Sequence, residues 1–259
     1  MINMSKPKLI FKFNRINDNT KESLKESYLW FSPASNLNDP FDLQYRFSER
    51  LWQEILDKLV DDFEQGLAKK LEEQDKSGAG ATLGQLSRRK IESEKFREDT
   101  MKLIREQIQY SVCCFTEQDD NILMWSHYAE NHSGICLMYD LSETPELWPV
   151  FNPVVYSDDY PICDSYDEVN KKGIFTKSKH WSYEREWRVL NFATSGKMTI
   201  NKKSLKGIIF GCRTRIDKAE EIVKICNDAG YQNLEYFKMK QNSEEYKLDK
   251  LTLSIRINK

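Results

Sequence analysis

The sequence predicts an α+β fold: a mixed, mostly antiparallel sheet with flanking helices and an inserted helical hairpin at about 47–109. Two observations predict this class. Strand-like and capped helical stretches follow one another along the chain, while the region 47–109 is helical in pattern. The 259 residues are 39% hydrophobic and 12% aromatic, enough to bury a sizeable core. No internal repeat or strong linker divides the chain, so we expect a single domain over 1–259.

The N-terminal elements are predicted in the order strand, helix, strand. "KLIFKFN" (8–14) alternates in polarity, residues 17–27 form a short helix capped by Asn or Thr, and "YLWFS" (28–32) is a second strand. The loop "PASNLNDPFD" (33–42) is rich in Pro, Asn and Asp, whose side chains hydrogen-bond the nearby backbone. We expect a rigid loop, either capped only by its own side chains or forming a polar wall for a ligand with hydroxyls.

The hairpin prediction rests on apolar residues that recur every four positions from 47 to about 76. "SGAGATLG" (77–84) breaks this helix, and a second one follows at about 86–109. We expect two antiparallel helices that serve as a lid or a partner surface, including for a second copy of the chain.

The later elements follow the same alternation. Strands are expected at 110–115, 134–140, 184–192 and 205–211, with two closing strands after 233; helices are expected at 119–131, with Asp caps, and at 217–230.

Composition and charge limit the function classes. No apolar run has the length of a signal peptide or a membrane helix, so a cytoplasmic protein without a membrane partner is expected. The six cysteines form no C-x-x-C pair, and no metal site is expected. Residues 141–170 carry seven acids and no Lys or Arg, whereas 197–259 carry 14 basic and 8 acidic residues. The basic segment indicates either an unevenly charged surface or a nucleic-acid footprint.

Residues 113–140 combine three cysteines, a tryptophan and two histidines with acids and amides. Within the helix predicted there, Trp125 and Tyr128 are three residues apart and share a face, while His127 lies on another. The segment therefore either lines a ligand site or packs an aromatic core.

The stretch "WSYEREWRVL" (181–190) is the most informative. On a strand, Glu184, Glu186 and Arg188 point to one side. Such a face is too polar for a core unless its charges are paired or line a cavity. The alternative is an exposed edge with cross-strand salt bridges.

Several of these segments resemble a known family. "FKFNR", "LWFSPASNLNDPFD", "CCF", "MWSHYAENHSGICLMYD", "KHWSYEREWRV" and "LKGIIFG" are similar, in order, to a bacterial domain-of-unknown-function family, number twenty-nine seventy-one. The resemblance spans nearly the whole chain apart from the hairpin and the tail, and it implies no activity.

A fold-level resemblance links the chain to ADP-ribosyltransferases, which split nicotinamide from NAD. It implies Lys12 or Arg15 as the polar residue of the first strand, Ser32 on the second, and Glu186 at the catalytic position of an E-x-E motif with Glu184. Lys12 departs from the usual His or Arg there, and the hairpin is an addition.

The same resemblance implies NAD as the substrate and a nucleotide pocket. Its further binding residues are Asn38, Asp39, Trp125, His127, Tyr128 and Arg188. Trp125 or Tyr128 would stack on nicotinamide, and Arg188 or Arg15 would pair with the pyrophosphate. The acceptor that the resemblance implies is a nucleic acid or a protein.

Two alternatives remain open from the sequence. One is a nuclease or nucleic-acid-binding protein of toxin or phage-defence type, with Asp39 and Asp42 as its candidate acidic pair. The other is a non-enzymatic module that binds a partner through the hairpin.

Overall fold

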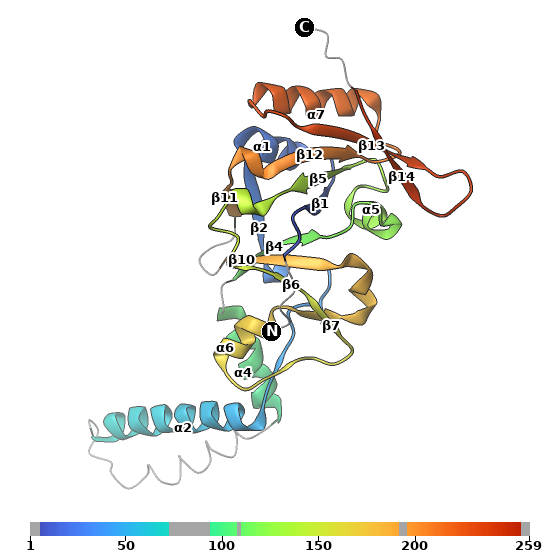
Figure 1. The fold of residues 1–259 in the computed structure, drawn as a ribbon. Coiled ribbons are helices and arrows are strands. Elements are labelled where there is room, and N and C mark those ends of the chain that lie inside the picture. The colour runs from blue at the N-terminus through green and yellow to red at the C-terminus, as the bar shows by residue number, and fades with distance from the viewer. Residues whose placement is uncertain (1–5, 73–93, 108–109, 192–195, 255–259) are drawn as a thin grey trace. The chain divides into compact units, whose positions relative to one another are not determined.

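The computed structural model describes residues 6–72, 94–107, 110–191 and 196–254. The chain divides into two compact units (Figure 1). The first comprises Met1–Asp42, Tyr110–Asp158 and Lys177–Lys259, and the second comprises Leu43–Gln109 and Asp159–Thr176. Helices and a mixed, mostly antiparallel sheet are present, which confirms the predicted α+β class.

A ten-stranded sheet forms the first unit. Its main path runs β11–β2–β4–β1–β5–β12–β13–β14, and β10 pairs with both β4 and β6. Every one of these pairings with a printed register is antiparallel except β12 with β13. The strands are β1 (Ile10–Asn14), β2 (Tyr28–Pro33), β4 (Ser111–Thr116), β5 (Ile135–Tyr139), β6 (Phe151–Pro153), β10 (Glu186–Asn191), β11 (Gly196–Thr199), β12 (Leu205–Phe210), β13 (Glu235–Gln241) and β14 (Leu248–Thr252).

The sheet splits at β4. Along one side, β10 pairs with the whole strand, from Glu186 opposite Thr116 to Asn191 opposite Ser111. On the other side, β2 pairs only with the beginning of β4, and β1 pairs only with its last residue. β1 pairs over its full length with β5 instead. The strands β1 and β2 therefore separate from each other beside the middle of β4, which leaves an opening in the sheet.

Different helices pack on the two faces of this sheet. On one face, α1 (Asp18–Glu26) and α7 (Ile216–Asp228) cover alternate strand residues such as Ile10 and Leu137. On the other, α5 (Ile122–Tyr128) packs on Phe11, Phe13 and their neighbours. The period-two alternation in β1 and β5 thus places apolar side chains on both faces.

Local capping explains where the helices begin. The side chain of Asn17 accepts a hydrogen bond from the Thr20 N–H at the start of α1. Asn121 accepts from the N–H groups of Leu123 and Met124 at the start of α5. The predicted Asp cap is therefore wrong, and so is the predicted length of 119–131. Helix α5 ends at Tyr128, and residues 130–132 follow with φ between 50° and 72°.

The second unit contains α2 (Glu49–Glu72) and α4 (Glu94–Gln107), both within the predicted hairpin region. It also contains β3 (Arg46–Phe47), which pairs in parallel with β8 (Ile162–Cys163), and the short helical turns α6 (Tyr166–Glu168) and η3 (Val169–Gly173). The predicted turn of the hairpin at 77–84 lies outside the described residues. The hairpin, the dimer through it and the single domain stay predictions.

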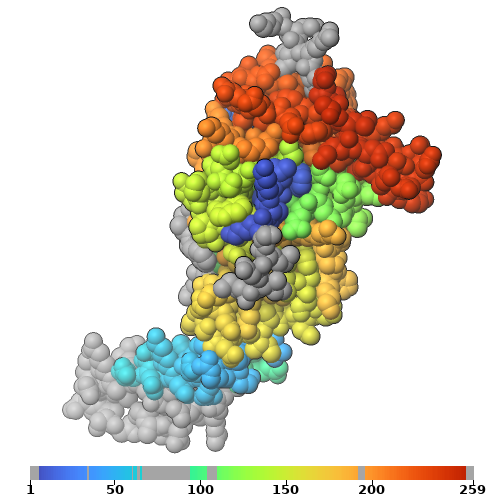
Figure 2. All heavy atoms as spheres, in the orientation of Figure 1, coloured from blue at the N-terminus to red at the C-terminus, as the bar shows by residue number. Residues whose placement is uncertain are grey.

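The remaining short elements are β7 (Val155–Ser157), β9 (Thr176–Ser178) and the 3₁₀ turns η1 (Ala34–Asn36), η2 (Leu141–Glu143), η4 (Lys179–Glu184) and η5 (Lys202–Ser204). The hairpin between β13 and β14 projects from the surface in Figure 2, where it is red, and carries the fully exposed Tyr246. Within the described residues, no helix combines the length and the hydropathy that crossing a membrane requires.

Candidate functional site

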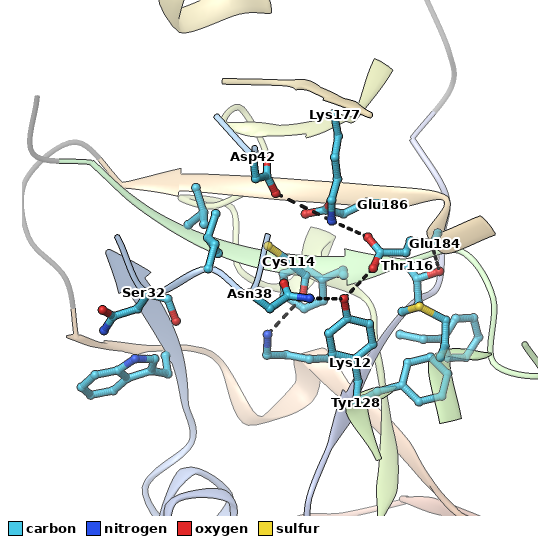
Figure 3. Close-up of a pocket in the computed structure, with 18 residues that line it drawn as sticks. Lys12, Ser32, Asn38, Asp42, Cys114, Thr116, Tyr128, Lys177, Glu184 and Glu186 are labelled. Atoms are coloured by element: carbon cyan, nitrogen blue, oxygen red, sulfur yellow. Dashed lines mark hydrogen bonds and ion pairs between the residues drawn. The ribbon is translucent and has the colours of Figure 1, made fainter. Parts of the chain in front are cut away.

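A cavity of about 300 Å³ occupies the opening of the sheet (Figure 3). Its walls come from the facing sides of β1, β2 and β4, from the 36–42 loop, from the end of α5 and from the start of β10. Seven residues that the sequence singles out line it: Lys12, Ser32, Asn38, Asp42, Tyr128, Glu184 and Glu186. The fold thus brings together side chains that lie up to 174 positions apart in the sequence.

The two glutamates reach this cavity through a backbone conformation that the sequence does not predict. Strand β10 begins only at Glu186, while Glu184 ends the 3₁₀ turn η4. Arg185 between them adopts the left-handed conformation, with φ 42° and ψ 53°. The prediction that Glu184 lies on the strand is therefore wrong. The turn nevertheless directs both carboxylates to the same cavity.

A buried charge cluster closes one wall. The Lys177 ammonium lies 2.6 Å from Glu184 Oε2, 3.2 Å from Glu186 Oε2 and 3.7 Å from Asp42 Oδ2. Arg188 donates from Nε to Glu186 Oε1 at 2.7 Å, and from Nη2 to Asp42 Oδ2 at 2.6 Å and to Glu186 Oε2 at 3.0 Å. Each of these five side chains is at most 4% exposed. Three carboxylates therefore share two cations without contact to bulk water.

The two glutamates differ in proton affinity. Burial raises the pKa of Glu186, but the charges of Arg188 and Lys177 outweigh burial and lower that pKa to about 2. Glu184 has no arginine contact; burial is the largest influence, and with the neighbouring Glu186 charge it raises the pKa of Glu184 despite Lys177. Opposite shifts in neighbouring carboxyl groups are typical of acid–base sites. Glu186 is thus a fixed anion, and Glu184 binds a proton more readily.

Tyr128 links α5 to this cluster. Its hydroxyl donates to Glu184 Oε1 at 2.6 Å and accepts from Asn38 Nδ2 at 3.1 Å. Burial and the Glu184 charge raise the pKa of Tyr128, so the phenol keeps its proton at neutral pH. The phenol can therefore orient the Glu184 carboxylate while its ring forms part of the cavity wall.

Trp125 belongs to the hydrophobic core. Its ring is fully buried, meets Phe13 edge to face at 5.0 Å, and donates from Nε1 to the Asp119 carbonyl at 2.7 Å. The segment 113–140 thus both lines a cavity and packs an aromatic core: Tyr128 and Cys114 face the cavity, and Trp125 packs behind it.

Lys12 places a cation at the opening between β1 and β2. Its ammonium donates to the Cys114 carbonyl at 3.0 Å and lies 5.4 Å from the Phe115 ring centroid. That carbonyl belongs to the middle of β4, where β1 and β2 have separated. Within the described part of the chain, Lys12 makes no ion pair. The ammonium is thus available to an anionic group in the cavity.

Besides Trp125, four predicted site residues lie outside the cavity. Arg188 is buried against Asp42 and Glu186 and does not line the cavity, so the structure does not place it for the predicted pyrophosphate contact. The Asp39 carboxylate accepts from the Phe41 N–H within its own loop. His127 is exposed, 6.4 Å from the Tyr183 ring. Arg15 lines a neighbouring cavity instead.

Sequence reasoning missed Lys177, and it considered Asp42 only as half of a candidate acidic pair with Asp39, not as a partner of Arg188. Asp42 lies 146 positions from Arg188, and no local pattern indicates that pairing. Lys177 precedes Glu184 by seven residues and lies on the short strand β9. Among the described residues, no group of three or more His, Cys, Asp and Glu side chains has an arrangement suited to a metal ion.

Comparison with known proteins agrees with the motif-based resemblance. Residues 124–189 match the family described as a protein of unknown function, DUF2971. The match confirms the predicted domain-of-unknown-function family, and it covers Tyr128, Lys177, Glu184 and Glu186. No curated protein and no solved structure matches this chain significantly.

Proposed function

We propose that the protein cleaves the bond between nicotinamide and ribose in NAD and transfers the ADP-ribose to water or to a macromolecular acceptor. An activity of this kind would suit a toxin or a phage-defence protein. The observation that carries the proposal is the meeting of four side chains in one cavity. These are a cation from the first strand (Lys12), a serine from the second (Ser32), and the two acids of an E-x-E motif where a late strand begins (Glu184 and Glu186).

The charges in the cavity suit the reaction. Loss of nicotinamide builds positive charge on the ribose carbon C1′, and a preorganised anion stabilises that charge. Glu186 is such an anion, since Arg188 and Lys177 hold it deprotonated and fixed. A positioned carboxylate beside the ribose 2′-hydroxyl is worth about 3 kcal/mol of transition-state stabilisation.

Glu184 then takes the role of general base. The C1′–N bond breaks and nicotinamide leaves as a neutral molecule with the bonding electron pair. The acceptor oxygen forms a bond to C1′ and gives its proton to Glu184 Oε1 or Oε2. The raised pKa of Glu184 favours this transfer, and Tyr128 and Lys177 hold the carboxylate in place.

The test is incubation of the purified protein with NAD and measurement of nicotinamide release. Glu186→Gln should lower turnover by about 10²–10³-fold. Glu184→Gln should affect the choice of acceptor more than nicotinamide release. The matched control is Glu235→Gln, on the exposed surface of β13, which should leave turnover unchanged.

Two outcomes would overturn the proposal. One is an active wild type with an equally active Glu186→Gln variant. The other is a wild type that releases no nicotinamide with water or with any protein or nucleic-acid acceptor. RNA and DNA incubated in parallel test the nuclease alternative, and retention of a protein on the isolated chain tests the binding module.

A further inference from the structure

A second cavity of about 380 Å³ adjoins the first, and five residues line both: Lys12, Phe13, Trp30, Ser32 and Tyr128. Its other walls come from the end of β1, the start of α1 and β2. Each cavity lies near the lower end of the roughly 300–1,000 Å³ that small-molecule sites occupy. The shared residues form a neck between the two cavities.

The two cavities differ in charge. The first is lined by three carboxylates, those of Asp42, Glu184 and Glu186, and by Lys177 and the shared Lys12. Lys12 and Arg15 line the second, where neither makes an ion pair within the described residues. The carboxylate in the second cavity, Glu22, is already paired with Lys197 at 3.0 Å. A ligand that spans the neck would therefore direct its anionic part toward Lys12 and Arg15.

Trp30 adds a flat apolar surface to the neck. It lies on β2 on the same side as Ser32, and it is 51% exposed. Within the described residues, its ring stacks on no other ring, and its indole N–H has no hydrogen-bond partner. An exposed tryptophan beside unpaired cations matches the chemistry of a nucleobase next to a phosphate.

We infer that the second cavity binds the distal nucleotide half of a dinucleotide, with the base stacked on Trp30 and the phosphates at Lys12 and Arg15. The identity of the other half rests on the proposed function. The carboxylate cavity holds the reacting ribose, and the cationic cavity holds the part of the substrate that does not react. Trp30 is then a specificity-determining residue that selects dinucleotides over mononucleotides.

The binding experiment uses ADP-ribose, which contains the distal half and lacks nicotinamide, and isothermal titration calorimetry with the full chain. Trp30→Ala should weaken ADP-ribose binding by about 5–150-fold, the range for loss of one base–aromatic stack. Arg15→Gln should weaken it in the same direction, with a loss that shrinks at high salt. Tyr246→Ala, in the exposed hairpin after β13, is the matched control and should bind as the wild type.

A kinetic comparison separates this inference from the proposed function. If NAD is cleaved, nicotinamide mononucleotide should be cleaved with a kcat/KM at least tenfold lower, and Trp30→Ala should reduce that preference. Equal kcat/KM for the two substrates, or unchanged ADP-ribose binding by Trp30→Ala, would overturn the inference while leaving NAD cleavage intact. ADP-ribose binding that depends on Trp30, without NAD cleavage, would support the second cavity and refute the proposed reaction. Binding of RNA in place of ADP-ribose would also overturn the inference.

Discussion

Replacement of Arg188 by methionine tests whether the buried cluster is held together as its geometry indicates. Arg188 is fully buried and makes three short contacts, two with Glu186 and one with Asp42. Removing one partner of a buried ion pair costs roughly 3–5 kcal/mol. At about 2–4 °C per kcal/mol for a chain of this size, Arg188→Met should lower the Tm by roughly 6–20 °C at pH 7.

The pH dependence of that loss has a definite sign. The pKa of Glu186 is about 2 in the folded protein and 4.5 ordinarily, so its ionised form contributes stability above pH 4.5. This contribution falls as the pH drops from 4.5 toward 2. Because Arg188→Met lacks most of it, the Tm difference between wild type and variant should shrink over the same interval.

The measurement is thermal unfolding followed by circular dichroism between pH 3 and 7. Arg215→Met is the matched control, since Arg215 pairs with Asp217 on the surface and such pairs contribute about 0–1 kcal/mol. Arg188→Lys should retain part of the stability, because it keeps the charge but not the planar fork. A Tm within about 2 °C of the wild type at pH 7, or a difference independent of pH, would refute the reasoning.

Three further predictions follow from the structure. Tyr128→Phe removes a hydrogen bond that lowers the pKa of Glu184, so the acidic limb of ADP-ribose transfer to the acceptor should move to higher pH; an unmoved limb would count against Glu184 as the base. Gly211→Ala places a Cβ 2.1 Å from the His132 carbonyl oxygen and should cost about 1–3 kcal/mol in urea unfolding, whereas an unchanged midpoint would contradict the close packing. Replacing both 43–109 and 159–176 by flexible linkers should leave a unit that unfolds cooperatively and binds ADP-ribose, because both segments belong to the second compact unit. An insoluble product from this deletion would show that the first unit does not fold by itself.

The sequence predicts the strands of this fold better than it predicts their pairing. Alternation locates β1, and short apolar runs locate β2, β4 and β5, each to within one or two residues of its observed bounds. The start of β10 is missed because Arg185 takes a left-handed conformation that a residue with a Cβ rarely adopts. Nothing local to an arginine indicates that geometry.

In the candidate site, too, the sequence reveals some of the residues but not how they pair. The polar residues of the E-x-E motif are conspicuous because charges at strand positions need partners or a cavity. The role of Asp42 as their partner cannot be read from the sequence, because its contact with Arg188 joins two segments that lie far apart in the chain. The spacing of Trp125 and Tyr128 shows that they share a helix face. Only the packing shows that one enters the core and the other the cavity.

The presence of five charged side chains in this buried cluster is itself an argument for a ligand. Stability does not explain them, because well-packed apolar residues in place of a buried ion-pair network are often neutral or stabilising. Within the cluster three carboxylates meet two cations, and the Lys12 ammonium of the same cavity balances the remaining negative charge. An anionic substrate group at Lys12 would leave that negative charge for a transition state that develops positive charge in the cavity, which gives the cluster a function that its energetic cost otherwise lacks.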